Sequence, residues 1–141
     1  MDQTYRTLKG YELLDPKTLT YAMEDYLEMI YRYCDSQYSI KNHQLAELLH
    51  VKPSSSSKMI KQLDELGYIE HKKYDKITLT PMGIQVASYL IERHQTINYL
   101  LCMINHSDNE IDLTEKIEHY FDIDTIHHLK IFLESLTKKT K

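Results

Sequence analysis

The feature that most constrains the fold is a segment bounded by a proline and a glycine, Pro53 and Gly67. Proline is favoured at the first position of a helix and glycine just past its last position. Apolar residues between them recur at the spacing of one helical face, and this face is expected to carry Met59, Ile60, Leu63 and Leu66. The segment therefore predicts one amphipathic helix that packs against a core.

Two predicted helices precede this helix and a predicted hairpin follows it. Apolar residues recur at helical spacing over about 19–35 and about 42–49. Residues 68–72 and 76–80 are β-prone stretches joined by three residues, which predicts a hairpin. Three helices followed by a hairpin are typical of a winged helix-turn-helix.

The rest of the chain is also predicted to be helical. Thr80-Pro81 starts a long helix to about Ile104, which is apolar on several faces and therefore expected at a domain or dimer interface. Two more helices are expected over about 112–121 and 123–136. The fold class is accordingly mainly α, with an N-terminal arm (1–18), a winged helix-turn-helix domain (19–80) and a helical domain (81–141).

Composition excludes several classes of protein. The 141 residues are 42% hydrophobic and 27% charged, which is typical of a globular protein, and three Gly and three Pro exclude a collagen-like chain. No apolar run reaches the length of a membrane span, and the first residues lack a signal-peptide core. Cys34 and Cys102 lack the spacing of a disulfide framework or a cysteine zinc site. We therefore expect a cytoplasmic protein that does not contact a membrane.

The charge is unevenly distributed. The formal net charge is −4, but residues 38–80 hold seven Lys against five Asp and Glu, whereas the remainder holds ten Lys and Arg against sixteen acids. A mildly basic middle between acidic flanks permits a nucleic-acid contact in one place and cation binding in another.

The basic middle contains a candidate surface for double-stranded DNA. Short serines would let the start of the Pro53 helix approach phosphates closely, and lysines on this helix and on the hairpin would supply charge. A serine-rich loop with solvated lysines is the alternative interpretation. The predicted DNA-binding residues are Pro53, Ser54, Ser55, Ser57, Lys58, Lys61, Lys72, Lys73 and Lys76. Because this segment holds no Arg to bind guanine bidentately, the bases that it reads are not predicted.

Two further groups have the residue types of a metal site. Asp25 and Glu28 are three residues apart on the first predicted helix, and Glu115, Glu118 and His119 have the i, i+3, i+4 spacing of one helical arc. The opposite, apolar side of that later helix is expected to carry Leu113, Ile117, Tyr120 and Phe121. Carboxylates and an imidazole so placed can hold a divalent cation, although solvated polar faces have the same spacing.

His94 lies among apolar residues of the long predicted helix, where a lone histidine is usually a hydrogen-bonded core residue. If the three helices converge, the acids would repel one another unless a cation lay between them. Spacing alone does not predict convergence.

Five motifs resemble the diphtheria-toxin-repressor family, in its manganese-transport-regulator branch. They are Met23-Glu24-Asp25-Tyr26-Leu27-Glu28-Met29-Ile30-Tyr31, Val51-Lys52-Pro53-Ser54-Ser55-Ser56-Ser57-Lys58-Met59, Leu79-Thr80-Pro81-Met82-Gly83, Arg93-His94 and Glu115-Lys116-Ile117-Glu118-His119. The resemblance runs in register from about Leu19 to Leu136. It implies a homodimeric, metal-activated transcriptional repressor that binds DNA with residues 19–80, and binds metal and dimerises with residues 81–141.

The resemblance also implies a set of metal ligands: Asp25, Glu28, His94, Glu115, Glu118 and His119. Iron-responsive relatives have a Met and a Cys where this chain has Asp25 and Glu118. Four carboxylates and two imidazoles suit Mn²⁺, with Fe²⁺ as a second choice and Zn²⁺ or Cd²⁺ as substitutes in vitro. Four acids exceed the needs of one ion, so we expect two Mn²⁺ per subunit.

The expected mechanism is that metal joins the two halves of the chain and fixes the spacing of the two recognition helices on a palindromic operator. The resemblance implies that such operators precede metal-uptake genes, so the protein would serve metal homeostasis. The family's longer members carry an SH3-like third domain, for which this chain is too short.

Two alternatives belong to other classes. A carboxylate-bridged di-metal enzyme would use the same ligands, but the chain lacks a paired Glu-x-x-His on two helices. A winged-helix regulator that senses an organic ligand would leave the acidic groups without a role.

Overall fold

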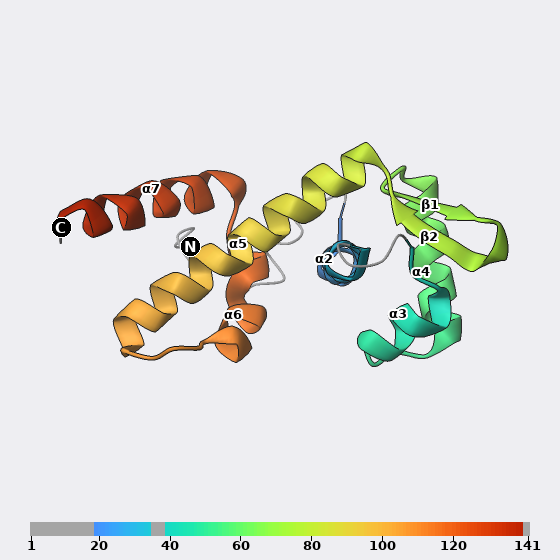
Figure 1. The fold of residues 1–141 in the computed structure, drawn as a ribbon, viewed down its shortest axis with the longest axis horizontal. Helices are drawn as coiled ribbons and strands as arrows, with labels where there is room; N and C mark the ends of the chain where they lie inside the picture. Colours follow the sequence, from blue (N-terminus) through green and yellow to red (C-terminus); the bar gives the residue numbers. More distant parts are fainter. Residues whose placement is uncertain (1–18, 35–38, 140–141) are drawn as a thin grey trace, which may run out of the picture.

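The computed structural model describes residues 19–34 and 39–139. The predicted N-terminal arm, 1–18, lies outside the described residues. The described chain runs α2 (Tyr21–Cys34), α3 (Asn42–Leu48), α4 (Pro53–Glu65), β1 (Ile69–Lys72), η1 (Lys73–Asp75), β2 (Lys76–Leu79), α5 (Pro81–Asn105), α6 (Ile111–Ile117), η2 (Glu118–Tyr120) and α7 (Ile123–Lys139). Figure 1 shows α2, α3, α4 and the hairpin gathered at one end of α5, with α6 and α7 along its other half.

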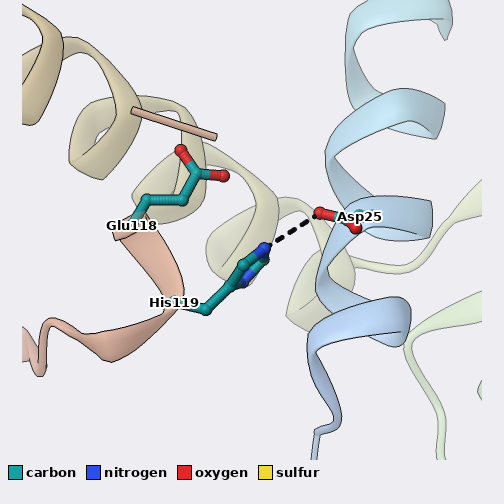
Figure 2. A group of neighbouring side chains, drawn as sticks. All are labelled: Asp25, Glu118 and His119. Atoms are coloured by element: carbon teal, nitrogen blue, oxygen red, sulfur yellow. Dashed lines mark ion pairs between the residues drawn. The ribbon is translucent and has the colours of Figure 1, made fainter. Parts of the chain in front are cut away.

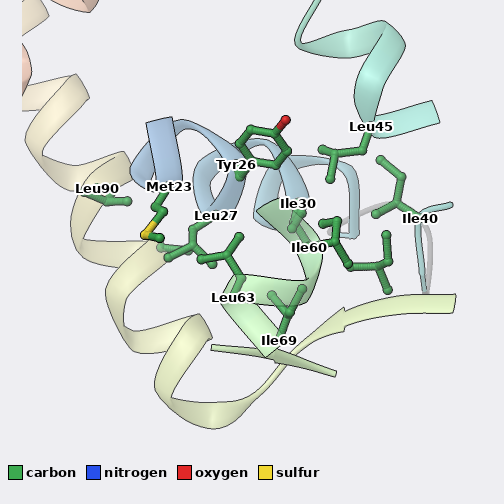
Figure 3. Packing of buried hydrophobic residues seen from close by; sticks show 12 residues of the cluster. Met23, Tyr26, Leu27, Ile30, Ile40, Leu45, Ile60, Leu63, Ile69 and Leu90 are labelled. Carbon is green, nitrogen blue, oxygen red and sulfur yellow. The ribbon is translucent and has the colours of Figure 1, made fainter. Parts of the chain in front are cut away.

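The first three helices, the hairpin and the first half of α5 enclose the main core (Figure 3). Its most deeply buried side chains, at 0–1% exposure, include Leu27, Ile30, Leu45, Ile60, Leu63, Ile69 and Ile77. Burying one such side chain stabilises a fold by roughly 1.5–3 kcal/mol. A smaller cluster of Ile97, Leu101 and Ile126 joins α5 to α7.

The hairpin is fastened to the helices at both ends. Strands β1 and β2 pair antiparallel, with Ile69 opposite Leu79. Ile40, just before α3, forms an isolated antiparallel bridge to Ile77 through hydrogen bonds of 3.1 and 2.9 Å. This bridge, which has no signal in the sequence pattern, joins the wing to the segment that leads into α3.

A tight joint connects the hairpin to α5. The Thr80 hydroxyl accepts a hydrogen bond from the Gly83 N–H at 3.1 Å, capping α5, and donates to the Gly67 carbonyl at 2.7 Å. Gly67 has φ +86°, a conformation that L side chains rarely adopt. Gly83 packs directly on the Tyr68 carbonyl. The start of α5 is therefore fixed against the turn that ends α4.

Two details differ from the sequence expectation. Leu66, expected on the buried face of α4, is 40% exposed because the helix ends at Glu65 and Leu66 lies in its C-terminal cap. The single helix expected over about 112–121 is α6 followed by the 3₁₀ turn η2. This change of helix type alters which residues after Ile117 face the interior.

Candidate metal centre and nucleic-acid interface

The start of α4 presents the predicted DNA-binding serines to solvent. Pro53 opens the helix, and Ser54, Ser55 and Ser57 are exposed, whereas Ser56 is fully buried. Lys58 and Lys61 are exposed on the same helix.

Asn42 at the start of α3 holds this end of α4. Its side-chain amide donates to the Pro53 carbonyl and to the Ser57 hydroxyl, each at 3.0 Å. The first turn of α4 is therefore positioned by α3, as a helix-turn-helix requires.

The wing carries the remaining predicted lysines and an exposed aromatic residue at its tip. Lys72, Lys73 and Lys76 are exposed, and Tyr74 at the tip is 84% exposed. Asp75 accepts a hydrogen bond from the Asn42 backbone N–H at 2.9 Å and lies 2.6 Å from the His71 ring. The wing tip is thereby attached to the N-terminus of α3.

Three segments far apart in the sequence converge at the candidate metal centre: α2, the middle of α5, and η2. Figure 2 shows Asp25 of α2 facing His119 of η2, with Glu118 beside it. Asp25, Glu118 and His119 form one group whose potential ligand atoms all lie within 4.8 Å of one another, and Glu28, His94 and Glu118 form a second. Glu118 is common to both groups.

Direct contacts link the members of each group. Asp25 Oδ1 lies 3.3 Å from His119 Nε2, and His94 Nδ1 lies 2.8 Å from Glu118 Oε2. Glu118 is 2% exposed, and His94 is partly buried with a hydrogen-bonded ring. His94 therefore fits both the core interpretation and the ligand interpretation.

Glu115 is exposed on α6 and belongs to neither group of described residues. The arc expected for this region is also different. Glu118 and His119 are buried, whereas Leu113 and Tyr120, expected on the buried side, are 40% and 53% exposed. The 3₁₀ turn that follows α6 rotates the chain, so a constant helical arc does not extend through residues 118–120.

Three residues of this region were not among the predicted ligands. Arg93 is 2% exposed, and its guanidinium donates to Glu24 Oε2 at 3.2 Å. Glu24 is itself buried and contacts His119 Nδ1 at 3.0 Å. Tyr21 stacks on the His119 ring with a centroid distance of 4.8 Å. Glu24 and Arg93 adjoin predicted ligands in the sequence, but spacing gives no signal that they are buried together.

Burial and neighbouring charged groups shift the pKa values of three of the predicted ligands. Burial raises the pKa of Glu28, and the nearby Glu118 carboxylate raises it further, against the opposing effect of Arg32. The hydrogen bond to Glu118 raises the pKa of His94. Burial lowers the pKa of His119, but hydrogen bonds to Asp25 and Glu24 outweigh it and raise the pKa to about 9.

The donor set fits a divalent cation. Glu118 lies beside the carboxylates of Asp25 and Glu28, and these like charges repel one another. The oxygen and imidazole donors of the two groups suit Mn²⁺ and related ions. No sulfur atom belongs to either group of described residues. None of the helices in the described ranges meets the length and apolarity that crossing a membrane requires.

Comparison with known proteins identifies the fold. Residues 18–77 match the family model described as iron dependent repressor, N-terminal DNA binding domain. An uncharacterised HTH-type transcriptional regulator of Methanocaldococcus jannaschii is 36% identical over 124 residues, which cover 86% of this chain and 99% of that protein. The HTH-type transcriptional regulator MntR of Lysinibacillus sphaericus is 35% identical over 111 residues, 78% of this chain and 80% of that protein.

A solved structure has a similar fold. The manganese regulator SloR superposes with a TM-score of 0.69 at 28% identity, over 79% of this chain and 53% of that chain. The present chain therefore spans about half the length of that structure. These relatives confirm the predicted winged helix-turn-helix fold class and a transcriptional regulator in place of an enzyme.

Proposed function

Because the chain belongs to the diphtheria-toxin-repressor family of metal-dependent transcriptional repressors, we propose that it is a manganese-activated member of that family. In this proposal it acts in the cytoplasm as a homodimer, binds palindromic operator DNA, and controls metal-uptake genes. Its metal ligands are Asp25, Glu28, His94, Glu115, Glu118 and His119.

The observation that carries the proposal is the shared carboxylate of Glu118. It belongs to one group with Asp25 and His119 and to a second group with Glu28 and His94. A carboxylate common to two ligand groups is a natural bridge between two ions, which supports two Mn²⁺ per subunit. Glu115, one turn before Glu118, is kept in the set on the family resemblance, and its exposed side chain would have to turn inward to join.

The two groups also explain how metal could control DNA binding. Asp25 and Glu28 lie on α2, which packs in the main core with α4 and the first half of α5, whereas His94 and Glu118 lie later in the chain, on α5 and η2. A bound divalent cation supplies positive charge that draws these carboxylates and imidazoles together. The ligands would then hold residues 19–80 in a fixed orientation against residues 81–141.

Orientation matters because a dimer reads half-sites about 34–36 Å apart, so a wrong or fluctuating spacing of the α4 helices loses affinity. The change in affinity can be no larger than the preference of the metal for the competent arrangement. Two divalent ions per chain would also cancel the formal charge of −4 and remove the general repulsion from DNA.

The homodimer is supported by apolar surface on the helical half. The exposed residues Tyr99, Met103, Ile104, Ile123, Ile131 and Phe132 of α5 and α7 are 38–66% accessible. Large apolar side chains on the surface mark an interface where they lie together in one patch. A second copy of the chain would cover this surface, in line with the expectation that the long helix, apolar on several faces, lies at a domain or dimer interface.

The test is DNA-binding affinity for a palindromic promoter fragment, measured by fluorescence anisotropy at fixed salt with a chelator and then with Mn²⁺, Fe²⁺ or Zn²⁺. We expect Mn²⁺ to tighten binding by between about 5-fold and 150-fold, the usual range of such coupling. Glu118→Gln should abolish the effect, whereas Glu134→Gln, an exposed glutamate of α7, should retain it. Equal affinity with chelator and Mn²⁺ would refute metal activation and favour a metal-independent regulator.

A second experiment tests the choice of metal. Sulfur ligands are softer than carboxylates, so the double substitution Asp25→Met and Glu118→Cys should relax selectivity from Mn²⁺ towards Fe²⁺. The measurement is DNA binding as a function of each metal concentration. If the ratio of the two activation midpoints is unchanged, these residues do not determine metal selectivity.

A further inference from the structure

Arg93 is a buried cation placed among the proposed ligands. It lies on α5 and is 2% exposed. Its Nη1 donates to Glu24 Oε2 at 3.2 Å, and its Nη2 lies 3.3 Å from His119 Nδ1 and 3.8 Å from Glu118 Oε1. One guanidinium therefore contacts α2 and η2 from α5, and joins residues 69 and 26 positions away in the sequence.

A charge in this position is costly to bury. Removing a charge from water costs several kcal/mol unless opposite charges and hydrogen bonds compensate for it. Glu24, 8% exposed, and Glu118, 2% exposed, carry the compensating charge. Each of these acids would in turn be a buried charge that needs a cation.

The hydrogen bonding between the guanidinium and its surroundings is incomplete. Its Nε has no hydrogen-bond partner among the described residues. Arg93 Nη2 and Glu118 Oε1 form an ion pair at 3.8 Å, which is too long for a hydrogen bond. The other oxygen of that carboxylate, Oε2, contacts His94 Nδ1 at 2.8 Å. Arg93 thus neutralises Glu118 without claiming both of its oxygens.

We propose that Arg93 is an internal counter-ion, which neutralises Glu24 of α2 and Glu118 of η2 when no metal is bound and competes with the metal for Glu118. This inference rests on the proposed metal-binding function and deepens it. Glu24 is the fixed partner of Arg93, and the pair holds the two halves of the chain together before metal arrives. The metal then adds to the link that Arg93 and Glu24 already form between the two halves. The positive charge of Arg93 lowers the affinity of the site for the metal.

The expected effect follows from Coulomb's law. A unit charge about 6 Å from a divalent cation changes its affinity by about tenfold, even with the screening of bulk water. Removing the charge of Arg93 should therefore tighten Mn²⁺ binding by at least about tenfold while it destabilises the metal-free protein. A residue that merely positioned the ligands would weaken metal binding when removed.

The experiment compares wild type with Arg93→Met. Mn²⁺ affinity is measured by competition with a chelating dye, and urea unfolding is measured with EDTA and with saturating Mn²⁺. Arg32→Met is the matched control, because Arg32 contacts the proposed ligand Glu28 at 3.0 Å but is 46% exposed and screened by water. We expect Arg93→Met to bind Mn²⁺ at least about tenfold more tightly than wild type and Arg32→Met to show a smaller increase than Arg93→Met, because salt and side-chain mobility weaken an exposed charge further.

Two more variants cover the case in which Arg93→Met does not fold without metal. Arg93→Lys keeps the charge and should bind Mn²⁺ within about threefold of wild type, whereas Glu24→Gln leaves Arg93 less neutralised and should weaken Mn²⁺ binding by several-fold. The counter-ion role would be overturned if Arg93→Met bound Mn²⁺ as wild type does or more weakly. If Arg93→Met is unfolded, unchanged Mn²⁺ binding by Glu24→Gln would overturn it. Neither result would contradict the proposed metal-binding function. Failure of the wild type to bind any divalent cation would overturn the proposed function together with the counter-ion role.

Discussion

Replacing Gly83 with alanine should destabilise this protein, although the same change stabilises most helices. Alanine is at most about 1 kcal/mol better than glycine within a helix. At Gly83, however, a Cβ would lie 1.9 Å from the Tyr68 carbonyl oxygen and 3.0 Å from its carbon. Both are backbone atoms, so the clash cannot be relieved by a side-chain rotation. The start of α5 must move away from the hairpin.

The magnitude combines three contributions. Overpacking of this kind costs about 1–3 kcal/mol. The Tyr68 carbonyl also accepts a hydrogen bond from the Thr80 N–H at 3.1 Å, whose weakening costs up to about 1 kcal/mol. After subtracting the gain in helix propensity, we expect a net loss of about 2 kcal/mol in the free energy of unfolding.

Urea unfolding of metal-free protein, followed by circular dichroism, measures this change directly. Ser88→Ala is the control, because Ser88 is exposed on the same helix and its replacement should change stability by less than about 0.5 kcal/mol. A Gly83→Ala variant as stable as wild type would show that α5 does not press on the hairpin in the way described. A variant more stable than wild type would contradict the reasoning altogether.

Three further predictions concern the proposed DNA-binding surface. Burial raises the pKa of Asp75, but hydrogen bonds from His71 and from the Asn42 N–H outweigh it and leave the pKa below its usual value of 3.8. The stabilisation is therefore complete above about pH 4 and is lost as the pH falls through the depressed pKa. The wing of the wild type should loosen over this range, as measured by amide hydrogen exchange, and Asp75→Asn should remove this pH dependence. Asn42→Ala should lower the free energy of unfolding by about 1 kcal/mol and weaken DNA binding, measured on the same samples, because the amide holds Ser57; unaltered DNA affinity would count against this positioning role. Lys61→Ala should reduce the slope of log affinity against log salt by about 0.9 if Lys61 neutralises one phosphate, and an unchanged slope would place it off the DNA.

Local structure was largely predictable from the sequence. Pro53 and Gly67 bound α4 and its cap as expected, because proline and glycine have strong positional preferences at helix ends. The hairpin and its three-residue link follow from β-prone stretches and their separation. Thr80-Pro81 marks the start of α5, where the threonine side chain caps the helix.

The three-dimensional arrangement of the candidate site was predictable only in part. Spacing selected Asp25, Glu118 and His119 by residue type, but their approach depends on a contact between segments more than 90 residues apart. A helical arc assumes constant geometry, and the 3₁₀ turn after Ile117 breaks that assumption. The burial of Arg93 could not be predicted, because a charged residue enters a core only when partners from other segments compensate for it.

The joint at Thr80 makes α5 act as a lever. The helix has 25 residues and is therefore about 37 Å long at about 1.5 Å per residue. With one end clamped to the hairpin, a tilt of about 5° moves the other end by about 3 Å, close to the rise of one base pair, about 3.4 Å. In a dimer whose subunits contact each other at the far ends of α5, a small change in the tilt of this helix would shift the recognition helix along the DNA. The accuracy of operator recognition would then depend as much on the stiffness of this single helix as on the side chains that touch the bases.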